Sequence, residues 1–263
     1  MVYESPDEPW GSRTLPLAMI DIIYLDERHF VMASDPITGF QRKYMSFGDM
    51  LGEWFYGFLM VAVVCGIIGG YSEILLNSPL GYGRIYLTVV LVVLTFGVNI
   101  TWGIIDGTTV IYGGLTDKAD LEKIISKLKK DRNNRELRDK ILDSIGDSSV
   151  DYLPDAEKEK IVDRIIDEAP EAPLKYHVSG DDRNTLIAIA SCDILAVIPV
   201  ILPYLLLGFG KVPLMLSRLI ASVAIGYIAF LYAEHTGRRK WLTAGIFVLF
   251  TIVVMQITYY FGW

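Results

Sequence analysis

Residues 85–107 read IYLTVVLVVLTFGVNITWGIIDG, and Asp106 is the only charged side chain among them. An α-helix of this length rises about 35 Å, which exceeds the roughly 30 Å hydrocarbon core of a bilayer. Strands of a membrane barrel would be about half as long and would alternate apolar with polar residues. The stretch therefore predicts a membrane-spanning helix.

Four further apolar stretches of similar length lie at residues 54–71, 186–207, 212–232 and 241–261. The five stretches together predict an all-α integral membrane protein with five transmembrane helices, which has the lipid bilayer as its surroundings. In this division, residues 1–47 form an N-terminal segment, residues 48–113 hold helices one and two, residues 114–183 form a charged helical insert, and residues 184–263 hold helices three to five. Within the first segment, residues 15–25 are apolar but too short to span, so we interpret them as an interfacial or packed segment. Acidic residues precede this segment where a signal peptide would carry basic ones.

Basic residues indicate the orientation of these helices. Arg28, Arg42 and Lys43 precede the first span, fourteen Lys and Arg lie in residues 114–183, and residues 238–240 add three more between the last two spans. The positive-inside rule then places the N-terminus and the insert in the cytoplasm and the C-terminus outside. Because no targeting motif is visible, we expect a prokaryotic cell membrane. The net charge of −7 argues against a nucleic-acid partner.

The insert carries three stretches in which apolar residues recur at helical spacing, residues 121–128, 137–145 and 161–166. Pro-Asp at residues 154–155 predicts the start of the third helix, and Ala-Pro at residues 169–170 predicts its end. So short a segment buries little surface. We therefore expect its apolar stripes to pack on one another or on a second copy of the protein.

The insert also holds eighteen Asp and Glu against its fourteen bases, and two interpretations stay open. One is a solvated surface with pairs at i,i+4 such as Glu136 with Lys140. The other is a cytoplasmic site in which carboxylate oxygens bind divalent cations. The candidate ligands of that site are Asp155, Glu157, Glu159, Asp163, Asp167 and Glu168.

Carboxylates inside the membrane spans are the strongest functional signal. Counted along the helices, Asp106 and Asp193 both lie roughly 10 to 12 Å below the cytoplasmic edge, so they could share one site. A charged side chain at such depth costs about 2.5 to 3.5 kcal/mol on insertion scales and usually faces a partner or a wet cavity. Glu53 lies at the cytoplasmic mouth of span one. Asn99 lies two turns from Asp106 and could extend a polar path outward.

Each of these residues also has a structural interpretation. Glu53 could be an interfacial residue beside Asp49, four residues earlier on the same helix face. Asp106 could cap a helix break at the following glycine. Asp193 could pair with Arg218 of the fourth span, which would need the full reach of the arginine side chain.

Several short motifs resemble a prokaryotic branch of the vacuolar iron transporter family. They are WGIIDG at residues 102–107, IPVILPYLL at residues 198–206, and a closing run from residue 217 to residue 262 that includes GRRKW at residues 237–241. The order of two spans, a helical insert and three spans is also similar, and the insert shares a Pro-Asp-Ala-Glu start before a basic amphipathic helix. The resemblance covers roughly residues 52–263.

This resemblance implies a homodimer that moves Fe²⁺, and often Mn²⁺, out of the cytoplasm in exchange for protons. Carboxylates and methionines of the first two spans would line the path, and glutamates of the insert would gather metal. The well-studied members carry Asn-Asp-Gly in span one, where this chain has Gly52-Glu53-Trp54, and Gly-Glu in span two, where Asp106 is the nearest acidic residue. The insert is also poorer in Glu and lacks paired methionines.

We therefore expect a divalent metal transporter for Fe²⁺ or Mn²⁺, coupled to protons, with no enzymatic activity and no resident cofactor. Its metal path would use Asp106, Glu53, Met60, Asp193 and Asn99, with the Met60 thioether as a softer ligand suited to Fe²⁺ over Mg²⁺. Deprotonated carboxylates bind metal, so metal and proton would compete for Asp106. No Walker loop is present, so transport would run on ion gradients.

Two alternatives remain, together with a prediction about assembly. The protein could be a non-transporting membrane scaffold whose cytoplasmic helices bind a partner. An intramembrane aspartyl protease would need two carboxylates about 3 Å apart, and the Gly-x-Gly-Asp and Pro-Ala-Leu patterns of such enzymes are absent. The glycines at positions 66, 69 and 70 permit close helix approach and predict a homodimer through span one, although they could instead pack within one subunit.

Overall fold

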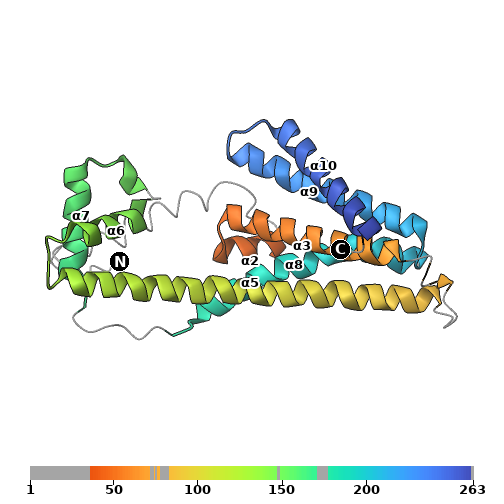
Figure 1. Ribbon diagram of the computed structural model, residues 1–263, viewed down its shortest axis with the longest axis horizontal. Helices are drawn as coiled ribbons and strands as arrows, with labels where there is room; N and C mark the ends of the chain where they lie inside the picture. The colour runs from red at the N-terminus through yellow and green to blue at the C-terminus, as the bar shows by residue number, and fades with distance from the viewer. Residues whose placement is uncertain are drawn as a thin grey trace, which may run out of the picture. The chain divides into compact units, whose positions relative to one another are not determined.

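The computed structural model describes residues 36–71, 74, 76–77, 83–146, 149–170 and 177–261 (Figure 1). Within these ranges the regular structure is helical, without any strand. The predicted interfacial segment at residues 15–25 and the C-terminal Trp263 lie outside the described residues.

Five long helices confirm the predicted fold class. They are α3 (Phe47–Gly70), α5 (Arg84–Leu128), α8 (Gly180–Leu207), α9 (Lys211–His235) and α10 (Lys240–Phe261). Each is long and apolar enough to cross a membrane. Two of them begin in polar sequence before the apolar run, because serine caps fix their starts: Ser46 accepts a hydrogen bond from the Asp49 backbone N–H, and Ser179 forms a capping box with Asp182.

Helix α5 continues past the predicted boundary between the second span and the insert. It continues unbroken for 45 residues, about twice what a bilayer needs, so the helix predicted at residues 121–128 is its continuation (Figure 1). The adjacent glycines Gly113 and Gly114 lower helix propensity by about 1 kcal/mol each, but no proline follows to end the helix. The second span and the start of the insert therefore share one helix.

The chain divides into two compact units. One comprises Phe40–Ala119 with Lys175–Trp263 and is called the membrane unit here; the other contains Asp120–Leu174 and is called the insert unit. In the membrane unit, α3 packs against α8, α9 and α10. The centre of the core is made by fully buried side chains such as Val61, Cys65 and Val200. Helix α3 is therefore the central helix of the described membrane unit.

The glycines at the end of α3 serve this packing. A β-carbon on Gly66 would collide with the Thr258 side chain, one on Gly69 would lie 2.8 Å from Leu214, and one on Gly70 would collide with a backbone oxygen of α10. These glycines are thus occupied within the chain by α9 and α10. They give no support to a homodimer interface through span one, and the intrasubunit interpretation of the three glycines is the correct one.

A short helix, α2 (Pro36–Tyr44), was not predicted from the sequence. Its Gln41 side chain is buried: Nε2 donates to Ser191 of α8 at 2.9 Å, and Oε1 accepts from the Trp54 indole of α3 at 3.0 Å. Near the end of α2, the Tyr44 hydroxyl accepts from Asn184 of α8 at 2.9 Å. Helix α2 is thereby fastened to α3 and α8.

The insert unit has a core of its own. Helices α6 (Arg135–Gly146) and α7 (Asp155–Glu168), with a 3₁₀ turn η1 (Ser149–Tyr152) between them, pack with the end of α5. The prediction that the apolar stripes pack on one another is confirmed by a buried cluster of Ile125, Leu128, Ile141, Val162 and Ile166. The predicted start and end of α7 are also confirmed, since it begins after Pro154 and ends before Ala169.

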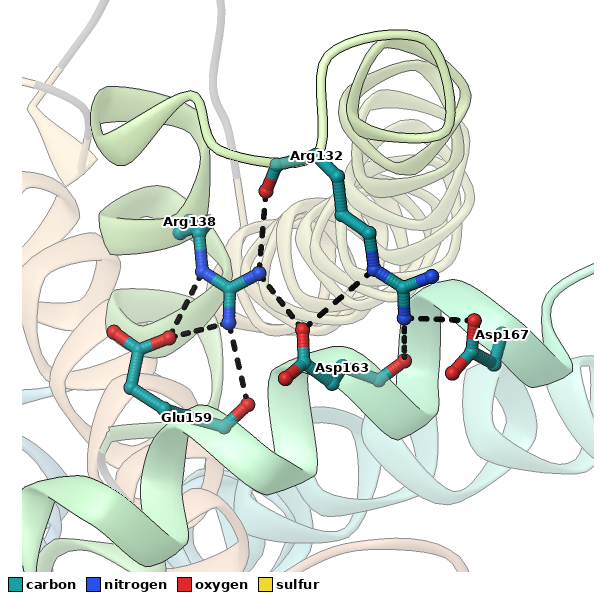
Figure 2. Close-up of polar contacts among 5 residues, drawn as sticks. All are labelled: Arg132, Arg138, Glu159, Asp163 and Asp167. Atoms are coloured by element: carbon teal, nitrogen blue, oxygen red, sulfur yellow. Dashed lines mark hydrogen bonds and ion pairs between the residues drawn. The ribbon is translucent and has the colours of Figure 1, made fainter.

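Arginines bind the acidic face of α7 (Figure 2). Arg138, whose side chain is only 14% exposed, donates from Nε to Glu159 at 2.8 Å and from Nη1 to Asp163 at 2.9 Å. Arg132 binds Asp167 at 2.7 Å, and its hydrogen bond holds the pKa of that carboxyl below its usual range. A lowered pKa in the folded state means that this contribution is present at neutral pH and is lost as the pH falls through the folded-state value.

We predict that Arg138→Met loosens α7. Hydrogen bonds to charged groups contribute about 1.5 to 3 kcal/mol, so amide hydrogen exchange across residues 155–168 should accelerate roughly tenfold or more. Arg164→Met serves as the control, because Arg164 makes an exposed i,i+4 pair with Glu168 on the same helix and should change exchange only about twofold. Equal acceleration in the two variants would contradict this account of α7.

Candidate functional site

Three carboxylates from three spanning helices meet in the membrane unit. Glu53 of α3, Asp106 of α5 and Asp193 of α8 each offer one oxygen, and these oxygens lie within 4.8 Å of one another. We call this group the carboxylate triad. Asp106 and Asp193, which counting along the helices placed at one depth, lie together, and Glu53, the third acidic residue of the predicted metal path, joins them.

The triad has no cationic side chain to balance it in the described structure. Asp193 is completely buried, and neither of its carboxylate oxygens has a hydrogen-bond donor; the Glu53 Oε2 atom is also buried without one. The alternative pairing of Asp193 with Arg218 is therefore wrong: the Arg218 guanidinium lies over the Tyr259 ring, 4.7 Å from its centroid. Buried acceptors without donors are costly, as are like charges in contact, so the site requires cations or protons.

Glycines bring the three helices together at Asp193. A β-carbon on Gly57 of α3 would lie 2.9 Å from the Asp193 Cα atom, and one on Gly103 of α5 would lie 2.6 Å from the Cα atom of Ala190 and 3.1 Å from Asp193 Oδ2. The two distances to Cα atoms, 2.9 and 2.6 Å, are too short for a real β-carbon. The close approach of α3 and α5 to α8 at this level therefore depends on the absence of side chains at these two positions.

The glycines that allow this close approach are visible in the sequence, but the sequence does not say which helix each one faces. Gly57 lies one turn after Glu53, and Gly103 and Gly107 flank Asp106 on α5. The alternative in which Asp106 caps a helix break at Gly107 is wrong, because α5 runs straight through this position. Gly107 instead faces Leu186 of α8, whose Cα atom lies 3.1 Å from where a β-carbon would stand.

Helix α2 bonds residues that are close in sequence to two of the triad carboxylates. Its Gln41 bridges Trp54, the neighbour of Glu53 in sequence, and Ser191, two residues before Asp193. The bridge joins α3 and α8 beside two of the three carboxylates. Because Gln41 is 1% exposed and both ends of its amide are bonded, it fixes the spacing of those two helices at the site.

Met60 and Asn99 do not join the triad. Met60 lies two turns along α3 from Glu53, and Asn99 lies two turns along α5 from Asp106, each about 10 Å away by helical rise. Asn99 is fully buried; its Nδ2 donates to the Thr95 carbonyl at 2.9 Å, and its Oδ1 has no donor within the described part of the chain. The five residues predicted as one site therefore separate into a triad and two more distant side chains.

The predicted ligands of the insert unit have a different environment. Glu159, Asp163, Asp167 and Glu168 all form ion pairs with arginines, and Glu157 is exposed in the first turn of α7. Lys140 and Glu136 pair at 2.7 Å, as the solvated-surface interpretation predicts. Across the described ranges, the group of acidic side chains whose oxygens converge is the carboxylate triad.

We predict that Gly103→Ala separates α5 from α8. Overpacking costs about 1 to 3 kcal/mol, so the melting temperature of the purified protein should fall by several degrees. Gly97→Ala is the matched control on the same helix, because nothing lies within 4 Å of its β-carbon position. It should be neutral or slightly stabilising, since alanine favours helix more than glycine does. Equal melting temperatures for the two variants would argue against the close approach at Gly103.

Comparisons with protein-family models, with curated proteins and with solved structures find no match for this chain. The resemblance to the vacuolar iron transporter family therefore stays a prediction.

Proposed function

We propose that the carboxylate triad is the binding site for a divalent cation that the protein carries across the membrane in exchange for protons. The observation that supports this is the convergence of Glu53, Asp106 and Asp193, with buried oxygens that no donor among the described residues satisfies. Oxygen ligands from three different helices form the kind of site that binds a hard divalent cation. Movement of any one helix would open or close such a site.

Charge balance gives the coupling to protons. Three carboxylates in a low-dielectric region repel one another unless positive charge is present. A divalent cation compensates two of the three negative charges and requires the deprotonated carboxylates. When the cation leaves, protons restore neutrality, so one group of residues binds either metal or protons and the two fluxes are linked.

The ligand set favours hard or borderline cations. Carboxylate oxygens suit Mg²⁺, Ca²⁺, Mn²⁺ and Fe²⁺, and the thioether of Met60 lies too far along α3 to bind the same ion at the same time. The family resemblance favours Mn²⁺ and Fe²⁺ over the other two ions. The family resemblance also implies export from the cytoplasm, and a homodimer would have to form through a face other than the glycines of α3.

We predict that the triad is required for transport driven by a pH gradient. Proteoliposomes with an imposed gradient should accumulate Mn²⁺ and Fe²⁺, and Asp106→Asn or Asp193→Asn should reduce the flux to that of empty liposomes. Asparagine keeps the size of the side chain but loses the full charge and the exchangeable proton. The flux is measured with a metal-sensitive dye inside the vesicles.

Asp181→Asn is the matched control, because Asp181 is an exposed residue at the start of the same helix as Asp193. Its flux should equal that of the wild type. If Asp106→Asn transported as well as the wild type, the site assignment would fail. If the wild type moved no metal at all, the scaffold function would replace transport, with the insert unit as the surface for a partner.

We also predict that metal binding releases protons. Calorimetric titration of Mn²⁺ in two buffers of different ionisation heat should give roughly one to two protons released per cation, because the carboxylates must deprotonate to bind. Glu53→Gln should release fewer protons and bind more weakly, whereas Asp181→Asn should match the wild type. Binding without any proton release would rule out the proposed coupling and leave only a cation site.

A further inference from the structure

Arg218 of α9 is a cation with two buried nitrogens that have no counter-ion among the described residues. Its Nε and Nη2 atoms are inaccessible to solvent, and neither has a hydrogen-bond acceptor within the described residues. An arginine side chain keeps its charge at any physiological pH, so it cannot escape this cost by losing its proton. The stacking of the guanidinium on the Tyr259 ring at 4.7 Å stabilises the charge only in part.

Two further polar groups interact with Arg218. They are the Tyr204 hydroxyl of α8 and the Cys65 thiol of α3; both residues are 1% exposed, and the hydroxyl has no nitrogen or oxygen partner among the described residues. These two side chains interact electrostatically with Arg218 and with each other. The neighbouring Ser217 donates to the Val200 carbonyl, which fixes α9 against α8 one turn from Tyr204. We call Arg218, Tyr204 and Cys65 the donor cluster.

The chemistry of the donor cluster is complementary to an oxyanion. Nε and Nη2 are the two guanidinium nitrogens whose N–H bonds run side by side, and such a fork binds carboxylate or phosphate. In the insert unit, Arg138 uses the same two nitrogens on the Glu159 carboxylate (Figure 2). A hydroxyl and a thiol add one donor each beside the Arg218 fork. The tetrahedral oxygens of a phosphate can accept from all of these donors.

The position of the donor cluster fits a phosphate at the membrane surface. Tyr204 lies three residues before the end of α8, Cys65 five before the end of α3 and Arg218 seven after the start of α9. By helical rise, these residues lie about 5 to 11 Å from the helix ends, and the long arginine side chain can extend toward the boundary between hydrocarbon and headgroups. The donor cluster is also separate from the triad, since Tyr204 lies about 16 Å along α8 from Asp193.

We propose that Arg218, Tyr204 and Cys65 form a binding site for a phosphate group, in which the Arg218 fork is the main ligand. Two sources carry the same chemistry at this depth, the phosphodiester of a phospholipid headgroup and free inorganic phosphate. In either case the bound anion neutralises the guanidinium and joins α3, α8 and α9 at the end of the membrane unit opposite the triad.

The test measures the melting temperature of the delipidated full chain in detergent. One arm adds inorganic phosphate against chloride at matched ionic strength, and the other adds phosphatidylglycerol against a galactolipid without phosphate. The wild type should gain roughly 5 °C, saturably, from at least one phosphate-bearing probe and nothing from its control. The responding arm identifies the source, and native mass spectrometry should show one bound phosphate or phospholipid per chain.

Variants separate this site from general charge effects. Arg218→Gln should abolish the gain, and Arg84→Gln, an exposed arginine at the start of α5, should keep it in full. If Arg218→Gln fails to fold, Tyr204→Phe decides the question, since loss of one hydrogen bond should weaken probe affinity roughly three- to tenfold. An equal response of wild type and both cluster variants, or no response of the wild type to either probe, would overturn the proposal.

Discussion

Burial of the Asp193 carboxylate is the constraint on which the membrane unit depends. Both of its oxygens are inaccessible and lack donors within the described chain, and Asp193 stands within the apolar run of α8. Glycines on α3 and α5 allow two neighbouring helices to approach it, and each brings a further carboxylate. Gln41 of α2 then fixes α3 to α8 beside the site. The packing thus concentrates negative charge where a hydrophobic core alone would exclude it.

Acidic side chains have opposite environments in the two units. In the insert unit, half-exposed carboxylates of α7 bind Arg132 and the largely buried Arg138 (Figure 2). In the membrane unit, the triad has no basic partner among the described residues, and water does not reach its buried oxygens. The same residue types therefore stabilise the fold in one unit, whereas in the other they must be balanced by protons or by a bound cation.

Among its described residues, the membrane unit carries charge of both signs without a partner of opposite charge. The triad presents acceptors, whereas Arg218, Tyr204 and Cys65 present donors. Helical rise separates the two groups by about 16 Å, so neither can neutralise the other by direct contact. Each group is consequently complementary to a ligand of opposite charge, and a ligand at either one would hold α3 to α8 at its own level of the bundle.

The sequence by itself determined the features that depend on local composition, namely the spans, the start of α7 and the apolar stripes of the insert. The five apolar runs were long enough to define the spans, and residues 154–155 marked the start of α7 because proline restricts the residue before it and favours the first turn. The stripes of the insert were found from helical spacing, since an amphipathic helix must bury its apolar face. Depth counted along two spans also brought Asp106 and Asp193 to one level.

Only the tertiary structure decided which residues from different helices meet. Glu53 joins the triad because Gly57 lets α3 approach α8, and a glycine in a sequence does not say which helix it faces. For the same reason Gly66 and Gly69 could indicate either a dimer or an internal contact, and they pack on α10 and α9 of the same chain. Rotation of a helix about its axis and the choice of its neighbours depend on long-range packing, which local composition does not encode.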